Sequence, residues 1–509
     1  MHYTDVLRRN ASRFPNRLAL AMCDTEDRRT FSELYLRSTR LANALRGIAA
    51  PGSRVAILSE NNLEYIEAYY GVPAAGMTLV PLNFRLHPLE WVWTLNNSGA
   101  RVILVTPDYL EAIADYRNDL TSVESIVVIG GNAPEFYSYE DLLGAASETA
   151  PDITFSDDDD AWILYTSGTT GKPKGARLSH RNLNTALIQS VIEYAPGPDT
   201  VMLNAMPLCH IAGYLAPLHQ YRGGSVLMMS GWDPERWMQI VAESRVTSGG
   251  FAPTMMQMLL AHPKINSYDL SSLEWMGYGA SKIPAEVLRQ TIEKFGPIVY
   301  AGMGMTEVGG NMITLDKAAH VRAASGETHL LDAVGKPMSL VDIRVANPDG
   351  ETCAPGEIGE MVVRGDQVTT GYLDNPTANA SAFTDGWFRT GDLARADEEG
   401  FLYIVDRAKD MIITGGENVY SVEVENAIHT NPNVLATAVI GLPDERWGEV
   451  VTAIVVPKAN ATVSEDDVIA SCTSQLARFK QPRRVIFADE LPQTVSGKVR
   501  KNVLREQYS

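Results

Sequence analysis

The sequence predicts an α/β protein with a smaller α+β domain at its C-terminal end, and three changes of pattern along its 509 residues support this. Short apolar runs such as Arg54–Leu58 and Val102–Val105 are typical of buried parallel strands, and helical patterns such as Glu33–Leu45 lie between them. From about Leu340, short strands alternate with Gly, Pro and Asp turns, which indicates a small β-rich subdomain. After Lys409, strands and helices alternate again over about a hundred residues, the size of one small domain.

Further elements of the α/β part are predicted from the same signals. Val226–Met229 and Trp275–Gly277 are expected to be short buried strands. The longest stretch without charge, between Glu67 and Arg85, is interrupted by glycines and prolines. It therefore predicts a buried helix, a turn and a strand, and not a membrane span.

The C-terminal part is predicted element by element. Three strands are expected in the β-rich subdomain: Ile343–Val345, Gly359–Arg364 and Phe401–Val405. The last hundred residues predict, in order, a helix, two strands and a helix: Val419–Ile428, Ala436–Gly441, Ala453–Pro457 and Ser464–Leu476. We therefore place an N-terminal domain at residues 1–406, a hinge at 407–410 and a C-terminal domain at 411–509.

The composition narrows the possible partners and the compartment. The net charge is −19, so the basic face that nucleic acids or anionic membranes require is not expected. The four cysteines, at positions 23, 209, 353 and 472, form no CxxC pair, which suits a reducing cytoplasm better than a disulfide framework. The first residues lack the apolar core of a signal peptide. We expect a cytoplasmic protein that has no integral membrane segment and binds no nucleic acid.

A loop rich in glycine and hydroxyl residues, LYTSGTTGKPKGARLSH at residues 164–180, suggests phosphate binding. It does not match an ATPase P-loop, because Gly168 and Gly171 are too close and Pro173 follows Lys172 where a magnesium-binding hydroxyl should stand. Taken as a short motif, such a loop could equally be a surface turn.

The longer run TSGTTGKPKGA, at residues 166–176, resembles the adenylate-forming superfamily, which contains acyl- and aryl-CoA synthetases. Six later stretches resemble the same family in order, so the resemblance covers nearly the whole chain: PLCH, GYGAS, YAGMGMTE, FRTGD, DRAKD with the following GGEN, and PQTVSGK. It implies a large N-terminal domain of stacked α/β subdomains with a small β-barrel-like subdomain, followed by a small mobile C-terminal domain.

The resemblance implies a role for each matching residue. Four are expected to take part in catalysis: Lys498, Glu307, Thr166 and His210. Glu307 is also the expected Mg²⁺ ligand, since a hard dication on phosphates needs oxygen ligands. ATP and AMP are expected to be bound by Thr166, Ser167, Gly168, Thr169, Thr170, Gly171, Lys174, Gly279, Ala280, Ser281, Tyr300, Ala301, Gly302, Met303, Gly304, Met305, Thr306, Asp392, Arg407 and Lys498.

The remaining expected roles concern the thiol and the acid. Lys409 would be the hinge residue on which the small domain turns between the two half-reactions. Coenzyme A is expected to contact Gly415, Gly416, Glu417, Trp447, Arg478 and Lys480. The acyl pocket is expected to be lined by His210, Phe251, Met255, Gly302, Gly304 and Met305. Relatives that act on acetate have a tryptophan at the position of Gly304, so an open pocket is expected here.

The function implied is an ATP-dependent acyl-CoA synthetase with Mg²⁺, ATP and coenzyme A as its cofactors, acting alone or as a homodimer. A medium-chain, long-chain or bulky apolar acid is the first expectation for the substrate, and an aryl or cinnamate-type acid is the alternative. A stand-alone adenylation enzyme that loads a carrier protein is a third reading, although the acid expected near PLCH for an amino acid substrate is missing. A nucleotide-binding regulator without chemistry is disfavoured by intact Glu307, Asp392 and Lys498.

Overall fold

The chain forms two compact units, which are described separately below. The computed structural model describes residues 2–131, 133–154, 156–166, 173–279, 283, 285–459, 461–473, 475–494 and 498–509. The first unit runs up to Thr166 and includes Pro173–Asp342 and Arg364–Ala382, while the second includes Ile343–Val363 and Phe383–Ser509. Among the described residues, no helix is both long and apolar enough to cross a membrane.

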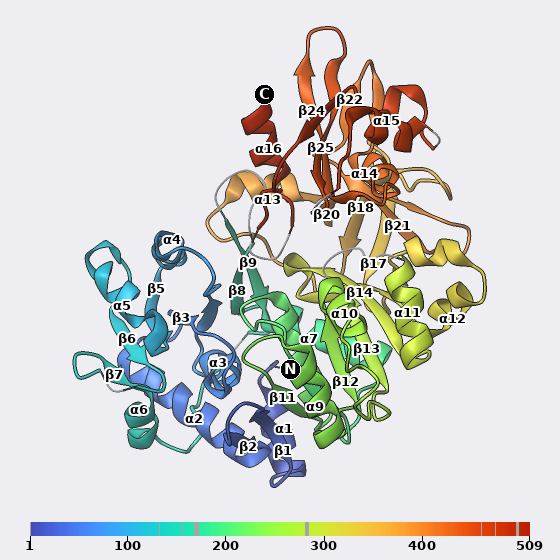
Figure 1. Ribbon diagram of the computed structural model, residues 1–509. Coiled ribbons are helices and arrows are strands. Elements are labelled where there is room, and N and C mark those ends of the chain that lie inside the picture. Colours follow the sequence, from blue (N-terminus) through green and yellow to red (C-terminus); the bar gives the residue numbers. More distant parts are fainter. Residues whose placement is uncertain are drawn as a thin grey trace. The chain divides into compact units, whose positions relative to one another are not determined.

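A nine-stranded sheet forms one half of the first unit (Figure 1). Its strands, in sheet order, are β16 (Lys336–Pro337), β15 (Gly310–Leu315), β14 (Val299–Met305), β13 (Trp275–Gly279), β12 (Ser248–Phe251), β10 (Val201–Asn204), β11 (Ser225–Met228), β1 (Leu18–Met22) and β2 (Arg28–Thr30). The six strands from β14 to β1 are parallel to one another. The strands predicted at Val226–Met229 and Trp275–Gly277 are confirmed as β11 and β13, with ends shifted by one or two residues.

A seven-stranded sheet forms the other half of the first unit. In sheet order its strands are β7 (Tyr137–Ser138), β6 (Ser125–Val128), β5 (Ala100–Val105), β3 (Arg54–Leu58), β4 (Thr78–Pro81), β8 (Asp160–Thr166) and β9 (Lys174–Ser179). All neighbours pair in parallel except β9, which returns antiparallel along β8. The predicted strands at Arg54–Leu58 and Val102–Val105 and the helix, turn and strand between Glu67 and Arg85 are confirmed.

Helices cover both faces of the seven-stranded sheet, which explains why its strands are apolar throughout. Val55 and Ile57 of β3 join a core built with α2 (Phe31–Ile48), α3 (Leu63–Ala74), α7 (His180–Tyr194) and α8 (Leu215–Gln220). That core also contains residues of β1 and β11, so it joins the two sheets. Ala56 and Leu58, which alternate with them, pack on α4 (Pro88–Ser98) and α5 (Pro107–Asp115).

The remaining helices of the first unit complete its outer layers. α9 (Pro234–Ser244), α10 (Pro253–Leu260), α11 (Ala285–Phe295) and α12 (Lys317–Ala324) lie beside β12, β13 and β14 (Figure 1). The last three helices are α1 (Asp5–Arg13), α6 (Tyr139–Ala145) and α13 (Pro376–Ala382). Helix starts follow ordinary capping chemistry: at α2, the Thr30 hydroxyl accepts from the Glu33 amide while the Glu33 carboxylate accepts from the Thr30 amide.

The second unit begins with an antiparallel five-stranded sheet, which is the small β-rich subdomain expected from the sequence. It consists of β17 (Asp342–Ala346), β18 (Gly359–Arg364), β19 (Phe383–Thr384), β20 (Trp387–Ala396) and β21 (Leu402–Arg407). β20 is the central strand and pairs with β18, β19 and β21. The pairing of β20 with β21 brings the predicted nucleotide residues Asp392 and Arg407 directly opposite each other.

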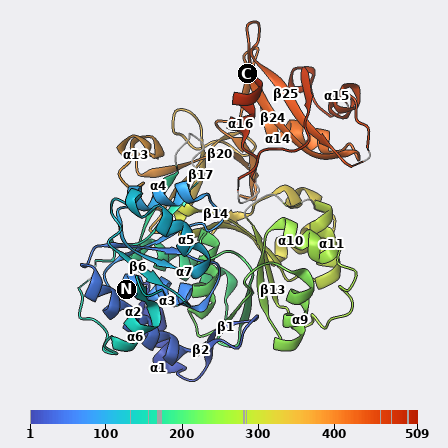
Figure 2. The ribbon, with the colours of Figure 1, turned by 60° about the vertical axis from the view of Figure 1, so that its left-hand side comes forward.

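The C-terminal sheet is sandwiched between helices (Figure 2). Its strands are β23 (Glu417–Val419), β22 (Ile412–Thr414), β25 (Gly448–Pro457), β24 (Val434–Asp444) and β26 (Arg484–Phe487). On one face Val439 and Val455 pack against α14 (Ser421–His429) and α15 (Glu465–Thr473). On the other face Ile440 and Ile454 pack against α16 (Lys501–Tyr508).

The fold class is confirmed, and two of the predicted helices are shorter than expected. The helix predicted at Val419–Ile428 begins at Ser421, because Val419 pairs with Ile412 in a β-hairpin. The helix predicted at Ser464–Leu476 ends at Thr473, and the Ser464 hydroxyl accepts from the Asp467 amide at its start. The three-part division at residues 406 and 411 stays a prediction.

Glu67 of α3 offers a test of the first unit's stability. Its carboxylate is fully buried, 2.5 Å from Arg37 Nε and 3.3 Å from Arg29 Nε, and it accepts from the Tyr139 hydroxyl at 2.8 Å. Glu67→Ala would leave these partners without their acceptor, so we expect the unfolding free energy to fall by about 3–5 kcal/mol in urea denaturation. The control is Glu140→Ala, which removes an exposed partner of Arg37 and should cost at most about 1 kcal/mol. Equal losses for the two variants would contradict the assignment.

Candidate active site

The β8–β9 hairpin positions the two ends of the glycine-rich loop. Thr166 and Lys174 form the last register pair before it, and the Thr166 hydroxyl donates to the Lys174 carbonyl at 3.4 Å. Several predicted ATP ligands lie outside the described residues, namely Ser167, Gly168, Thr169, Thr170, Gly171, Ala280 and Ser281. The described part of the hairpin therefore contributes Thr166 and Lys174 to the candidate site.

Glu307, Tyr372 and Lys174 come together in the first unit. Glu307 lies in the short 3-10 helix Thr306–Val308, is 7% exposed, and accepts a hydrogen bond of 2.9 Å from the Tyr372 hydroxyl. Lys174 Nζ lies 5.1 Å from the centroid of the Tyr372 ring, within the range of a cation–π contact. Burial, together with the charge of Glu307, raises the pKa of Tyr372, so its hydroxyl remains a donor. Tyr372, which was not predicted, thus contacts both Glu307 and Lys174, which were.

Tyr372 was missed in the sequence analysis, and its position explains why. It stands 65 residues after Glu307, so only the fold brings the two side chains together. The preceding residue, Gly371, has φ +131° and its N–H donates to the Thr369 hydroxyl. The Thr369 amide in turn donates to the Glu307 carbonyl at 2.7 Å, so the segment that carries Tyr372 is tied to the Glu307 backbone. The sequence offered one signal, the Gly371–Tyr372 pair, but such a pair does not reveal that Tyr372 contacts Glu307.

The carboxylate of Glu307 fits a magnesium site that the nucleotide would complete. One of its oxygens accepts from Tyr372, and an ionised carboxylate has further lone pairs to offer. Among the described residues, no group of three or more His, Cys, Asp or Glu side chains could hold a metal by itself. One carboxylate combined with substrate phosphates is a usual way to hold Mg²⁺, so this donor set suits a nucleotide-borne ion.

A glycine face on β13 and β14 lies at the carboxyl ends of the parallel strands. A Cβ on Gly279 would come 2.5 Å from the Gly302 carbonyl oxygen, and one on Gly304 would come 1.9 Å from the Gly310 carbonyl oxygen. Any larger residue would force these strands apart. Gly304 is therefore required by the pairing of β14 with β15, which is a different reason from the open pocket expected from the sequence.

Asn311 of β15 covers the side of Gly302 where a side chain would stand. A Cβ on Gly302 would come 2.2 Å from Asn311 Nδ2. This amide nitrogen donates to the Tyr194 hydroxyl at 3.1 Å, so it is held in place by α7. The amide next to Gly302 was not predicted, because no element was assigned to Gly310–Leu315 from the sequence.

The loop that carries His210 is hydrogen-bonded to Asn61, which lies just before α3, and to Tyr69 of α3. The Asn61 amide donates to the carbonyls of Met206 and Met229 and accepts from the Leu208 amide. The Tyr69 hydroxyl donates to the Leu208 carbonyl. A Cβ on Gly213 would lie 1.9 Å from this hydroxyl, so the glycine after PLCH is needed for this contact. His210 itself is half-buried.

The structure does not bring all the predicted pocket residues together. Phe251 is opposite Tyr278 in the β12–β13 register, whereas Gly279 is opposite Gly302. Alternation along β13 therefore puts Phe251 on the other face of the sheet from Gly302. There Phe251 packs against Trp237, with ring centroids 5.2 Å apart.

Met255 and Tyr300, also predicted to belong to the site, make other contacts in the structure. Met255 is buried on α10, where its sulfur accepts from the Ala252 amide at the start of the helix. Tyr300, predicted to contact ATP, lies near the amino end of β14, away from the carboxyl-end glycines. It contacts Tyr194 and Trp275 instead.

In the second unit, Asp392 and Arg407 form an ion pair. Arg407 Nε lies 2.7 Å from Asp392 Oδ1, and the Asp392 side chain is 5% exposed. The two residues face each other in the β20–β21 register. The structure therefore brings together two residues that were predicted separately to hold the ribose and the phosphate.

The predicted hinge is anchored on both sides. The buried Asp406 carboxylate accepts from the hydroxyl and the amide of Ser421. Lys501 of α16 lies 2.6 Å from the Ser421 hydroxyl and 2.7 Å from Glu425. Beyond Lys409, the Asp410 carboxylate accepts from Arg505 at 2.9 Å.

The glycines at the predicted thiol position form a tight hairpin turn. Gly415 and Gly416 have φ +61° and +85° and connect Thr414 to Glu417, which are register partners. A two-residue hairpin turn of this kind needs φ above zero at both positions, and glycine adopts it without strain. The Gly415 amide donates to the Trp447 carbonyl at 2.7 Å, so the turn lies against the predicted CoA tryptophan.

Two arginines flank Trp447. The guanidinium carbons of Arg446 and Arg483 lie 4.8 and 4.4 Å from the Trp447 ring centroid. Lys480 instead donates to both oxygens of Glu423 at 2.8 Å, which neutralises its charge locally. The predicted Arg478 lies with Lys480 in the 3-10 helix Arg478–Lys480.

Lys498 is exposed, and its backbone is paired with Thr494. Its amide donates to the Thr494 hydroxyl at 3.1 Å, and its carbonyl accepts from the Thr494 amide at 2.7 Å. Gln493 and Val499 form a β-bridge next to this pair. These contacts hold the backbone of Lys498, while the residue stays on the surface of the unit.

Comparison with known proteins agrees with this geometry. The family of AMP-binding enzymes matches residues 7–373, and the C-terminal domain of AMP-binding enzymes matches residues 423–498. Feruloyl-CoA synthase of Amycolatopsis sp is 40% identical over 482 residues, covering 94% of each chain. Long-chain-fatty-acid–CoA ligase FadD13 of Mycobacterium tuberculosis is 34% identical, covering 99% of this chain and 98% of its own.

Solved structures are similar over the same length. The ATP-bound MatB from Rhodopseudomonas palustris is 32% identical, with a TM-score of 0.88 over 100% of this chain and 99% of its own. The anthranilate CoA ligase AuaEII in complex with anthranoyl-AMP is 26% identical, also with a TM-score of 0.88. These matches show that the chain belongs to the AMP-binding enzyme family, within the adenylate-forming superfamily, and is an AMP-forming acid–CoA ligase.

Proposed function

We propose that this ligase activates a compact aryl acid of the cinnamate type. The observation that carries the proposal is the Asn311 amide beside Gly302, hydrogen-bonded to the Tyr194 hydroxyl at 3.1 Å. If the acid lies along the glycine face, its far end meets a polar amide and an aromatic ring. Such a boundary favours a ring with oxygen substituents over a long alkyl chain, because the second N–H of this amide can donate to a ring oxygen but finds no acceptor among methylenes.

The relatives support two candidate substrates. The relative from Amycolatopsis sp, 40% identical, is a feruloyl-CoA synthase. Another relative, 33% identical, is the indoleacetate–CoA ligase of Aromatoleum aromaticum. These names favour an aryl acid. The FadD13 name supports the second candidate, the medium- or long-chain apolar acid first expected from the sequence.

The first half-reaction would be R–COO⁻ + ATP → R–CO–AMP + PPi. Thr166 and Lys174 would contact the phosphates, while Asp392 would accept from the ribose hydroxyls. Glu307 would hold Mg²⁺, which, when bound, neutralises phosphate charge and makes pyrophosphate a better leaving group. Lys498 would place its ammonium beside the carboxylate and the α-phosphate, because two anions must approach each other there.

The second half-reaction would be R–CO–AMP + CoA–SH → R–CO–S–CoA + AMP, after a turn at Lys409. The glycine turn at Gly415–Gly416 would back the pantetheine thiol, with Trp447 behind it. Among the described residues, neither Arg446 nor Arg483 forms an ion pair with a carboxylate, so they are better candidates than Lys480 for the CoA phosphates. We also propose a homodimer in the cytoplasm, with a carrier protein as the alternative acceptor to coenzyme A.

Lys498→Ala tests the catalytic lysine. We expect acid-dependent ATP–pyrophosphate exchange to be abolished, at a cost of roughly 2–4 kcal/mol or more in activation free energy, because preorganised charge at the transition state is lost. The matched control is Lys458→Ala, which removes another exposed lysine of the same unit and should leave exchange unchanged. Normal exchange by the Lys498 variant would refute the assignment.

Tyr372→Phe tests the residue that the structure adds to the site. The ring next to Lys174 is kept, while the hydrogen bond to Glu307 is lost. We expect kcat/KM for adenylation to fall about tenfold, with a larger Mg²⁺ requirement, since a lost hydrogen bond to a charged group costs about 1.5 kcal/mol. Tyr268→Phe, which removes a tyrosine hydrogen bond to Glu235 elsewhere, is the control. An unchanged Mg²⁺ dependence would argue against a role at the metal.

A panel of acids tests the substrate class. Pyrophosphate release and CoA consumption are measured with cinnamate, hydroxylated cinnamates and saturated C6 to C16 acids, and cinnamates are expected to give the highest kcat/KM. Asn311→Leu should lower the ratio of hydroxycinnamate to alkyl kcat/KM about tenfold or more, because the polar contact is replaced by an apolar one. A wild-type preference for long alkyl acids, unchanged in Asn311→Leu, would favour the second candidate.

A further inference from the structure

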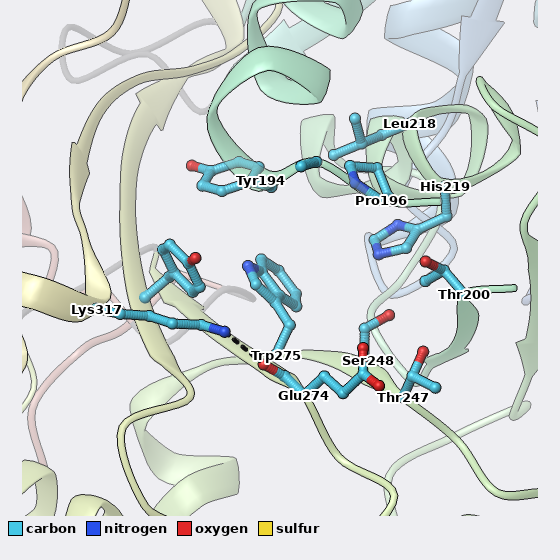
Figure 3. Close-up of a pocket in the computed structure, with 12 residues that line it drawn as sticks. Tyr194, Pro196, Thr200, Leu218, His219, Thr247, Ser248, Glu274, Trp275 and Lys317 are labelled. Atoms are coloured by element: carbon cyan, nitrogen blue, oxygen red, sulfur yellow. Dashed lines mark hydrogen bonds between the residues drawn. The ribbon is translucent and has the colours of Figure 1, made fainter. Parts of the chain in front are cut away.

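A cavity lies at the amino edge of the nine-stranded sheet, at the opposite ends of the strands from the glycine face. It encloses about 100 Å³ and is bounded by the starts of β12 and β13, the end of α7 and the end of α8. Tyr194, His219 and Trp275 surround it, and Ser248 lies at its base (Figure 3). None of the roles proposed above for ATP, acid or CoA uses this cavity.

Side chains separate the cavity from the acid pocket. Trp275, Gly277 and Gly279 share one face of β13 because side chains alternate along a strand. The Trp275 indole folds back over Gly277, where a Cβ would come 2.1 Å from the ring. Together with the Asn311–Tyr194 hydrogen bond, the indole forms a partition between the cavity and the carboxyl-end glycines.

Two buried polar groups of the cavity have no hydrogen-bond partner among the residues that the structure describes. They are the Ser248 hydroxyl and the Trp275 Nε1–H, which belong to register partners on β12 and β13. Ser248 is 2% exposed. Buried polar groups are nearly always paired, so two orphans lining the same cavity indicate a missing partner inside it.

His219 adds a third polar group, and its protonation follows from its contacts. Its Nδ1 lies 2.8 Å from the Leu215 carbonyl oxygen, which can only accept, so Nδ1 carries the proton. Burial lowers the pKa of His219 to about 4, so the ring is neutral at pH 7. Nε2 is then an acceptor, and the cavity offers one acceptor with two donors.

The aromatic walls define the shape of the ligand. The ring centroids of Tyr194 and Trp275 are 5.6 Å apart, those of Tyr194 and Tyr300 are 5.7 Å apart, and those of His219 and Trp275 are 5.9 Å apart. Edge-to-face surfaces of this kind suit a flat ring. An apolar cavity of about 150 Å³ can hold benzene. The cavity in this protein, about 100 Å³, is therefore of the order of a single six-membered ring.

We propose that this cavity is a second binding site, separate from the acid pocket, for a neutral hydroxylated aromatic ring the size of phenol. The ring would pack against Trp275 and Tyr194, its hydroxyl would donate to His219 Nε2, and its oxygen would accept from Ser248 or from Trp275 Nε1–H. A carboxylate or phenolate is disfavoured, because its charge would lose water and face the lone pair of His219. The only cation among the lining residues is Lys317, whose ammonium already donates to the Glu274 carbonyl at 2.8 Å (Figure 3).

The test titrates the full-length enzyme with three probes, phenol, benzene and benzoate, by saturation-transfer NMR. Phenol is expected to bind with a Kd of about 1 mM, the affinity that about seven non-hydrogen atoms can supply. Benzene should bind several-fold more weakly, and benzoate should not displace phenol. Absence of phenol binding would mean that the cavity holds only water, and would overturn the proposal.

Conservative variants locate the site. Ser248→Ala removes one polar group and keeps the cavity walls, so phenol affinity should fall about three- to tenfold while benzene affinity is unchanged. Trp275→Phe removes the Nε1–H together with part of the aromatic wall, so both phenol and benzene should bind more weakly. The control is Ser38→Ala, which removes another buried unpartnered serine hydroxyl that does not line the cavity. Equal phenol affinity in all variants would overturn the assignment, and thermal unfolding confirms that each variant folds.

Competition distinguishes a separate site from an extension of the acid pocket. Phenol binding is expected to persist in the presence of saturating cinnamate and ATP, and displacement of phenol by cinnamate would overturn the separateness of the site. Phenol binding does not depend on which acid is activated. If the enzyme proves to prefer alkyl acids, the proposed substrate fails while the second site stands.

Discussion

Close backbone packing among β13, β14 and β15 is the constraint on which the rest of the site depends. At Gly279 and Gly304 a single added carbon would approach a carbonyl oxygen of a neighbouring strand within 2.5 Å. The space in which their side chains would stand is filled by the carbonyl oxygens of Gly302 and Gly310, so the backbone itself forms this part of the strand ends. Glu307 follows directly after these glycines, in the turn between β14 and β15. The position of Glu307 relative to the glycines is therefore set by backbone, which deforms less than side chains do.

The same constraint limits what can be inferred from a single glycine. Gly304 suggested an open acyl pocket because a larger residue closes the pocket of some relatives. In this chain the carbonyl of Gly310 excludes a side chain at that position, so the glycine would be required with any substrate. The residue that covers Gly302 is Asn311, seven positions beyond Gly304, and under the proposed function its amide is the better guide to specificity.

The fold was largely predictable from the sequence because its signals are local. Strands with two buried faces are apolar throughout, and β3 was identified with its exact bounds for that reason. Tyr372, Asn61 and Asn311 were missed because each acts through a partner distant in sequence, and Phe251 was misplaced because a strand's apolar residues do not reveal which face they occupy.

The anchoring of the hinge has a mechanical consequence. Asp406 is fixed by Ser421, which Lys501 also contacts, and Asp410 is fixed by Arg505. Both lysine and arginine come from α16, so the last helix holds the two ends of a three-residue segment. Ser421 and Arg505 both lie beyond Lys409 in the chain, so both anchors tie the segment to the C-terminal part. The proposed turn about Lys409 would therefore have to break the Asp406–Ser421 hydrogen bonds, and the buried Asp406 carboxylate would need new partners, since a buried charge without a partner is costly.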